Sequence, residues 1–427
     1  MYDDLATVAA AARVAQRRLG SASGQRRTEV LRHLEQLLRE REAELLAANK
    51  LDIESAEGTG LPEPVFKRLA LTSQKLETLR DGIRQLIEAD DPIGTIVRAT
   101  ELDDGLNLRQ VRAPLGVLLI IFESRPDAVI QIGSLALRAG DAVLMKGGSE
   151  ALHSNRALTD VLREAVTAAG LDPDVVQNIE GREAVSALLE MDQHIDLVIP
   201  RGSNDLVRSI QERSRIPVLG HAAGICQLYI DADADRDKAV RIAVDAKTDY
   251  PAVCNAIENL LVHEDFPHLD AVLDALEAEG VQLRGDDAVR TRRANMAAAT
   301  ADDWGTEYGN LTLSVALVDG VDRAVDFIHT HGSAHTEAIV TENPETAARF
   351  LNDVDAASVF WNASTRFADG FRYGLGAEVG IATGRIHARG PVGVEGLLTT
   401  RWLLEGEGQI AADYGPGKRT FTHRDLS

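Results

Sequence analysis

Cysteine is nearly absent from the sequence, which has only Cys226 and Cys254 in 427 residues. Two thiols cannot form the disulfide framework of a small secreted domain. They also lack the Cys-x-x-Cys spacing of a metal site, so no metal is expected. Basic residues are few as well, because 45 Lys and Arg stand against 67 Asp and Glu and give a formal net charge of −22. This charge excludes nucleic acid and anionic membranes as partners, since both attract basic surfaces. A small anionic substrate is still compatible with it where a few Arg and Lys converge.

Long apolar runs are also missing. The longest, over 115–122, is far shorter than the roughly 20 residues that cross a bilayer. The sequence starts with M-Y-D-D-L, with acids where a secretion signal needs basic residues, so a cytoplasmic protein is predicted. A hydrophobic content of 44% is typical of a globular protein, and the length predicts two or three domains.

The N-terminal part has the 3.6-residue apolar period of helices. One helix is expected over 6–19 and another over 26–49, after an S-A-S-G-Q segment that provides an N-cap. The pattern then alternates on both sides of an Asp-Asp-Gly turn, which predicts a β-hairpin over 98–112. A further strand is expected over 399–410. These strands pair either with the sheet edge of another subunit or within the same chain, and the sequence leaves both arrangements open.

Between these ends, short apolar strands alternate with amphipathic helices. In the first series the strands are expected over 116–122, 141–146, 175–179, 195–200 and 216–220. This order predicts a parallel, doubly wound sheet that binds its ligand at the C-terminal ends of the strands. A second series over 238–390 predicts another α/β domain, with Cys254 near its start.

Cys254 is the first candidate for chemistry. It lies in the segment Y-P-A-V-C-N, before an apolar run in which a helix is expected to begin near Pro251. A thiol at a helix N-terminus faces the positive end of the dipole, which favours the nucleophilic thiolate. The alternative, a small buried hydrophobic residue, is the commoner role of a lone cysteine. The polar neighbours Asp249, Tyr250 and Asn255 argue against it. Cys226 lies inside an apolar strand and is expected in the core.

Three glycine-containing turns follow expected strands of the first sheet. They contain Lys146 and Ser149, Gly181 and Arg182, and Gly202 and Ser203. Backbone N–H groups and helix N-termini in such turns can hold phosphates, with Lys or Arg adding charge. No G-x-G-x-x-G follows the first strand, so the usual dinucleotide fingerprint is absent. Three turns at successive strand ends nevertheless favour a dinucleotide.

Together these motifs resemble a known family. The chain contains, in order, F-E-S-R-P (122–126), K-G-G-S-E (146–150), R-G-S (201–203) and P-A-V-C-N (251–255), as in the aldehyde dehydrogenase superfamily. Within it, three later segments resemble the gamma-glutamyl phosphate reductase family: H-G-S-A-H-T-E-A-I (331–339), W-N-A-S-T-R-F (361–367) and the glycine-rich stretch 374–395. The resemblance is collinear over essentially the whole chain.

The resemblance implies an α/β fold with two doubly wound domains and a small β oligomerisation element. It assigns an NADP-binding domain to 1–97 and 113–225, and a catalytic domain to 226–396. The oligomerisation element comprises the hairpin 98–112 and the C-terminal strand region 397–427. A homo-oligomer, dimer or tetramer, is therefore expected. The chain has no length left for a kinase fold, so the glutamate 5-kinase that makes the substrate would be a separate chain.

The implied activity is that of an oxidoreductase of proline biosynthesis, which reduces L-glutamyl 5-phosphate with NADPH to glutamate 5-semialdehyde and phosphate. By position, Cys254 is the nucleophile that displaces phosphate and forms a thioacyl enzyme. Its backbone N–H and the Ser124 side chain match the oxyanion donors. The stretch 220–225 has no carboxylate where hydrolytic relatives carry a Glu that activates water. This absence favours reduction of an acyl phosphate or an acyl-CoA, and an acyl-CoA reductase on the same scaffold is the alternative.

The resemblance also assigns binding residues. For the cofactor, the matching positions around the adenosine and pyrophosphate are Lys146, Ser149, Gly181, Gly202 and Ser203, and Glu307 matches the carboxylate that holds the nicotinamide ribose. Lys146 and Arg182 near a 2′-phosphate would favour NADPH over NADH. For the substrate, Arg366 and then Arg125 are candidates to bind an anionic group, with a surface salt bridge as the alternative for each. His335 either contacts substrate or ties a loop.

Two other classes of function are weaker. A cysteine hydrolase or transferase without a redox cofactor predicts a His–Asp pair near Cys254 and no nucleotide turns, whereas the sequence has the turns and no clear pair. A catalytically silent oligomer is disfavoured because Cys254 is intact.

Overall fold

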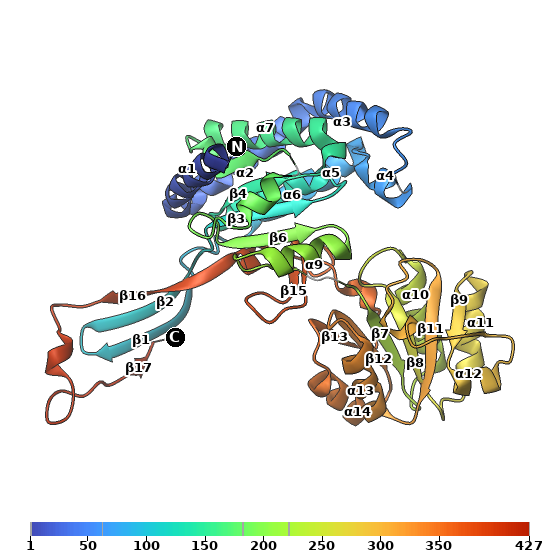
Figure 1. Cartoon of the computed structure of the whole chain (residues 1–427). Helices are drawn as coiled ribbons and strands as arrows, with labels where there is room; N and C mark the ends of the chain where they lie inside the picture. Colours follow the sequence, from blue (N-terminus) through green and yellow to red (C-terminus); the bar gives the residue numbers. More distant parts are fainter. Residues whose placement is uncertain (1, 62, 182, 221–222, 427) are drawn as a thin grey trace.

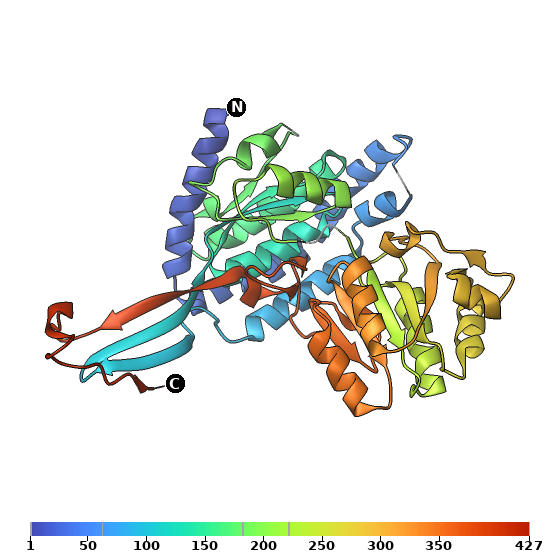
Figure 2. The same cartoon turned by 60° about the horizontal axis from the view of Figure 1, so that its bottom comes forward.

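The computed structural model describes residues 2–61, 63–181, 183–220 and 223–426. It has two lobes, each built on a parallel sheet, and a long antiparallel arm that projects away from both (Figure 1 and Figure 2). The N-terminus lies on the first lobe and the C-terminus on the arm (Figure 1). Among the described residues, no helix is long and apolar enough to cross a membrane.

The first lobe contains a four-stranded parallel sheet of order β5-β4-β3-β6. Its strands are β3 (Val117–Phe122), β4 (Ala142–Lys146), β5 (Val176–Asn178) and β6 (Leu197–Arg201). Every residue of β3 is apolar and buried, as expected for a strand with both faces covered. The predicted parallel sheet is therefore confirmed. The strand expected over 216–220 is wrong: only Val218 bridges to Val198, because Pro217 has no N–H with which to extend a ladder.

Helices cover this sheet. Those that follow its strands are α6 (Asp127–Ala139), α7 (Leu152–Ala168), α8 (Ala184–Leu188) and α9 (Asn204–Arg213). The N-terminal helices are α1 (Tyr2–Ser21), α2 (Gly24–Glu40), α3 (Glu42–Ala56), α4 (Glu63–Leu69) and α5 (Ser73–Glu88). The Ser23 hydroxyl caps α2 by accepting the Arg26 N–H, which confirms the expected N-cap. The single helix expected over 26–49 is wrong, because the chain breaks at Arg41 and α3 turns to pack on α7.

The second lobe contains a seven-stranded parallel sheet of order β10-β9-β11-β8-β7-β12-β13. The strands are β7 (Cys226–Ile230), β8 (Ile257–His263), β9 (Gln282–Gly285), β10 (Ala297–Ala298), β11 (Thr312–Val318), β12 (Thr336–Val340) and β13 (Ser358–Trp361). Its helices are α10 (Arg236–Thr248), α11 (Leu269–Ala278), α12 (Asp287–Arg292), α13 (Val321–His331) and α14 (Pro344–Asp353). The second α/β series is thus confirmed. Because β7 and β8 are neighbours, the strand that starts at Cys226 lies beside the one that follows Cys254.

The arm is a four-stranded antiparallel sheet of order β16-β2-β1-β17. It consists of β1 (Ile96–Asp103), β2 (Leu106–Pro114), β16 (Leu398–Glu405) and β17 (Arg424–Asp425). The predicted hairpin is confirmed. The C-terminal strand pairs with β2 of the same chain, from Leu398 opposite Pro114 to Glu405 opposite Asn107. The strands thus pair within the chain, and pairing of the outer edge with another subunit stays a prediction.

The segment before β16 returns to the first lobe. It forms the two-stranded pair β14 (Gly380–Ala382) and β15 (Gly390–Val392). Val379, Ala382, Val392 and Leu397 pack in the same hydrophobic core as β3 and β4. The sequence placed the end of the catalytic domain at residue 396. In the structure, the apolar side chains from about 379 onward are already buried against the first sheet, so this segment packs with the first lobe.

Candidate active site

A cavity of about 1100 Å³ lies between the two lobes. Its walls combine the strand ends of the first sheet with residues 250–255, Glu307 and 366–369 of the second lobe. Ten of the residues singled out in the sequence line it: Cys254, Ser124, Lys146, Ser149, Gly181, Gly202, Ser203, Glu307, Arg366 and Arg125. The two lobes thus bring the predicted nucleophile and the predicted cofactor turns into one space.

The two remaining expected residues have different outcomes. Arg182 lies outside the described residues, so its expected role stays a prediction. His335 is fully buried, and its Nδ1 lies 2.9 Å from the Thr336 hydroxyl and 3.5 Å from the Cys226 sulfur. His335 directly precedes β12, contacts the first residue of β7 and does not line the cavity. The structure therefore supports the role of tying a loop and not a substrate contact.

Cys254 is half-buried in a turn region, residues 249–256, which we call the Cys254 loop. The helix expected from Pro251 is wrong: two turns, Val253 N–H to Tyr250 O and Ala256 N–H to Val253 O, lead directly into β8. The apolar run that suggested a helix is the buried strand β8 itself. A helix dipole therefore cannot be the cause of any activation of this thiol.

The Cys254 loop is held from several sides. The Cys226 thiol donates to the Cys254 carbonyl at 3.1 Å, and the Asn255 amide donates to the Ala368 carbonyl at 2.9 Å. The ends of the loop are joined by a fully buried ion pair between Lys247 and Glu258, 2.6 Å apart. Within the described chain, no group accepts the backbone N–H of Cys254. The loop is therefore fixed, while this one donor stays available.

Arg366 also supports the loop. Its Nε donates to an Asp249 carboxylate oxygen at 3.1 Å, and Arg372 donates to the same oxygen at 3.0 Å. The hydrogen bond from Arg372 and the nearby charge of Arg366 hold the pKa of Asp249 below its usual value. Arg366 was the first candidate to bind a substrate anion, with a surface salt bridge as the alternative. In the structure it forms a salt bridge with Asp249, and its side chain is largely buried. Its guanidinium is committed to the loop because Asp249 begins it.

Both the backbone N–H and the side chain of Ser124 bind Glu150. Its φ is +47°, a left-handed conformation that is rare for residues other than glycine. The Ser124 N–H and hydroxyl both donate to the same Glu150 oxygen, each at 2.7 Å. The hydroxyl, expected as an oxyanion donor, is therefore directed to a carboxylate and not into the cavity. This leaves the Cys254 N–H as the donor with no partner among the described groups.

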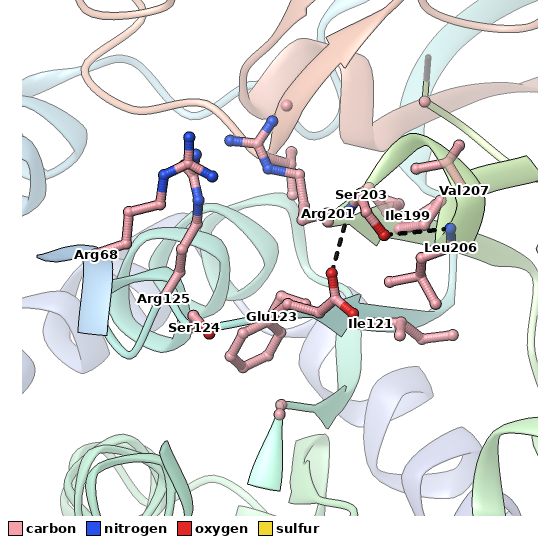
Figure 3. Close-up of a pocket in the computed structure, with 18 of the residues that line it drawn as sticks. Arg68, Ile121, Glu123, Ser124, Arg125, Ile199, Arg201, Ser203, Leu206 and Val207 are labelled. Atoms are coloured by element: carbon pink, nitrogen blue, oxygen red, sulfur yellow. Dashed lines mark hydrogen bonds between the residues drawn. The ribbon is translucent and has the colours of Figure 1, made fainter. Parts of the chain in front are cut away.

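The turns expected to hold a cofactor form the opposite wall. Ser203 caps α9 by accepting the Leu206 N–H, and its own N–H donates to Glu123 at 3.1 Å (Figure 3). A side chain at Gly202 would meet the Glu123 carboxylate at 2.5 Å and a Leu206 methyl group at 2.7 Å, so either side chain would have to move. Glu307 accepts the Gly224 N–H at 3.0 Å and the Asn204 amide at 2.9 Å. Glu307, from the second lobe, thus contacts the first lobe at the N-terminus of α9.

Sequence reasoning missed two arginines in the cavity. Arg68 from α4 and Arg201 at the end of β6 line it together with Arg125, which follows β3. The guanidinium groups of Arg68, Arg125 and Arg201 point to the same side in Figure 3, and the charges of Arg201 and Arg68 both act on Arg125. Burial, followed by the charges of Arg201 and Arg68, lowers the pKa of Arg125 to about 10. Neither missed residue had a motif that marked it, apart from the R-G-S turn that begins with Arg201.

Comparison with known proteins identifies the family. The model of the aldehyde dehydrogenase family matches residues 2–303. The gamma-glutamyl phosphate reductases of Pelotomaculum thermopropionicum and a Cyanothece species are each 50% identical to the chain, over 96% and 99% of it and over 94% and 98% of their own lengths. The crystal structure of gamma-glutamyl phosphate reductase from Thermotoga maritima has a TM-score of 0.92 at 37% identity, covering 95% of this chain and 99% of that one. The chain therefore belongs to the aldehyde dehydrogenase family and, within it, to the gamma-glutamyl phosphate reductases.

Proposed function

We propose that this protein reduces L-glutamyl 5-phosphate to L-glutamate 5-semialdehyde and phosphate with NADPH. The observation that carries the proposal is the shared cavity, in which Cys254 faces the glycine-containing turns of the first sheet. A hydrolase without a redox cofactor would need no such turns. The relatives named above, at 50% identity over nearly the whole chain, support the same reaction.

The cavity residues fit a nicotinamide dinucleotide. The volume of about 1100 Å³ is ample, and the N-terminus of α9, capped by Ser203, offers N–H groups that suit a pyrophosphate. We assign Lys146, Ser149, Gly181, Gly202 and Ser203 to the adenosine and pyrophosphate, and Glu307 to the nicotinamide ribose. The first lobe would thus bind the cofactor, and the second lobe would supply Cys254. The bound dinucleotide supplies the hydride that reduces the acyl carbon.

In this proposal, Cys254 carries the covalent steps. Its sulfur attacks the acyl carbon, the bond from that carbon to the bridging oxygen breaks, and phosphate leaves with the electron pair. The Cys254 N–H donates to the oxygen that becomes negative in the tetrahedral state. After reduction, the carbon–sulfur bond breaks and the sulfur takes its electron pair, releasing the aldehyde. The described part of the 220–225 segment adds no carboxylate to activate water, which protects the thioacyl enzyme from hydrolysis.

The reaction run backward tests this function. We expect NADPH to form from glutamate 5-semialdehyde and NADP⁺ only when inorganic phosphate is present, because the thioacyl enzyme needs phosphate as its acceptor. Absorbance at the NADPH band measures the rate, and CoA in place of phosphate is the control. Formation of NADPH without phosphate would mean that water releases the acyl group. Formation with CoA alone would identify an acyl-CoA reductase instead.

Cofactor choice is a second test. We expect Lys146→Ala to reduce the ratio of kcat/KM for NADPH over NADH by about tenfold, since a charged hydrogen bond to phosphate contributes roughly 1.5–3 kcal/mol. Initial rates with both cofactors measure this ratio. Lys50→Ala, an exposed lysine of α3, is the matched control and should leave the ratio unchanged. An equal loss with both cofactors would show that Lys146 does not read the 2′-phosphate.

The arm is the surface we propose for self-association. It carries exposed hydrophobic side chains on strands and on the chain beyond them: Ile96, Val97, Trp402, Leu404, Ile410 and Phe421. Exposed apolar groups gathered on a projecting sheet favour contact with another protein surface. We propose a homo-oligomer, dimer or tetramer, with the arm in the contact. A separate glutamate 5-kinase chain would supply the labile acyl phosphate.

A further inference from the structure

Three arginine side chains converge in the cavity from separate elements. Arg68 comes from α4, Arg125 from the turn after β3, and Arg201 from the end of β6. Figure 3 shows the three guanidinium groups on one side of the cavity. We call these residues the arginine cluster. Its members are far apart in the sequence, so the fold alone assembles them.

The arginine cluster lacks close counter-charges. Within the described part of the chain, none of its members has a carboxylate oxygen within 4.0 Å. Two buried arginines elsewhere in the chain are paired with carboxylates: Arg27 binds Asp91 at 2.7 Å, and Arg80 binds Glu42 at 3.2 Å. A third, Arg138, donates instead to the Thr28 hydroxyl and the Ala89 carbonyl. The three half-buried arginines of the cluster have no such carboxylate partner among the described residues, although they line a cavity.

Two acids act on the cluster from a longer range. Asp127 attracts Arg125, and Glu378 feels the charges of Arg201 and Arg125. Glu378 accepts the Gly370 N–H at 2.9 Å, and burial raises the pKa of its carboxyl. The two acids cannot neutralise three cations, and like charges gathered in a half-buried cavity are costly unless an anion joins them. The positive charge that is left favours binding of a multiply charged anion.

The chemistry of the anion follows from the place of the cluster. Arg125 and Cys254 line the same cavity, and Cys254 is among the groups that act electrostatically on Arg125. An anionic group bound by the cluster therefore shares this cavity with the carbon that Cys254 attacks. In L-glutamyl 5-phosphate the phosphate is attached to that carbon through the bridging oxygen, whereas the α-carboxylate is at the other end of the molecule. A guanidinium group can also donate two parallel hydrogen bonds to two oxygens of one phosphate.

We propose that Arg68, Arg125 and Arg201 bind the phosphoryl group of the substrate and hold phosphate as it leaves. This inference rests on the proposed function. As the carbon–oxygen bond breaks, the departing phosphate gains the electron pair, and the three guanidinium groups stabilise that negative charge. In the reverse direction the same groups orient inorganic phosphate for attack on the thioacyl carbon.

Kinetics of the reverse reaction test this assignment. We expect Arg68→Gln and Arg201→Gln each to raise the KM for inorganic phosphate by about tenfold or more, while the KM for glutamate 5-semialdehyde is unchanged. Arg→Lys at the same positions should recover only part of the loss, because lysine lacks the fork. Arg292→Gln removes an exposed cation of α12 and is the control. A raised KM for the semialdehyde with an unchanged KM for phosphate would overturn the proposal and assign the cluster to the α-carboxylate.

Thermal unfolding with inorganic phosphate alone gives a second measurement that does not depend on turnover. We expect phosphate to raise the Tm of the wild type, and this rise to be lost in Arg125→Gln. Without phosphate, Arg125→Gln should unfold no earlier than the wild type, because it removes a like charge from the cluster. Suppose that phosphate raises the Tm of the wild type but not of Arg125→Gln, while the wild type shows no phosphate-dependent turnover. The proposed reaction would then be disproved, and the anion site would still be supported. An equal Tm rise in both proteins would overturn the site.

Discussion

Cys254→Ala is expected to lower the rate of NADPH oxidation with L-glutamyl 5-phosphate by at least about a thousandfold, because the variant cannot form the thioacyl enzyme. Cys254 is the cysteine that lines the cavity, whereas Cys226 is buried behind it and donates its thiol to the Cys254 carbonyl. No second thiol can therefore replace the nucleophile. Steady-state rates measure the loss, and intact-protein mass spectrometry should detect the acyl adduct in the wild type only.

Cys226→Ser is the matched control for this substitution. The serine hydroxyl can still donate to the Cys254 carbonyl, so the Cys254 loop should keep its position and most of the activity. If Cys254→Ala kept more than about one-tenth of the wild-type rate, covalent catalysis at this residue would be excluded. If both variants lost activity equally, the effect at Cys254 would reflect damage to the loop and not loss of the nucleophile.

Much of the first lobe could be predicted from the sequence because its signals are local. The all-apolar strand β3 and the glycines after β4 and β6 mark where strands end and helices begin. Those strand ends then had to meet at one edge, since carboxyl ends of parallel strands do so. The local segment already marked Cys254, and the motif order of the family added Glu307 and placed both residues opposite these turns, which no local pattern shows.

The errors arose where a pattern was ambiguous or a partner was remote. The run after Cys254 has apolar residues that fit either a helix or a buried strand, and only its place between β7 and β11 decides for a strand. Ser124 was assigned by its position in the family motif and Arg366 as a candidate anion contact, and the sequence did not show the carboxylates that bind them, Glu150 and Asp249, which come from other segments. Arg68 is more than 50 positions from the rest of the arginine cluster, so no spacing could reveal it.

The segment 220–225 lacks the carboxylate of hydrolytic relatives, and it also contains Gly224, which lies against the Cys254 loop. A side chain at Gly224 would lie 2.4 Å from the Cys254 carbonyl oxygen and 2.5 Å from its Cα and Cβ. These are loop atoms that no side-chain rotation can remove. The Gly224 N–H also donates to Glu307 at 3.0 Å, so the same residue contacts both the nucleophile and the proposed ribose ligand.

Gly224→Ala is therefore expected to lower kcat by about a hundredfold, because relief of the clash needs a shift of about 1 Å between Cys254 and Glu307. Gly305→Ala is the control: a side chain there meets nothing within 4 Å, and it should change neither rate nor Tm. Rates and thermal melts of both variants separate misplacement from unfolding, since a folded Gly224→Ala protein with low kcat has lost only alignment. A folded variant with the wild-type kcat would contradict this close approach. The bare backbone at Gly224 would then have no part in setting the nucleophile against the cofactor wall.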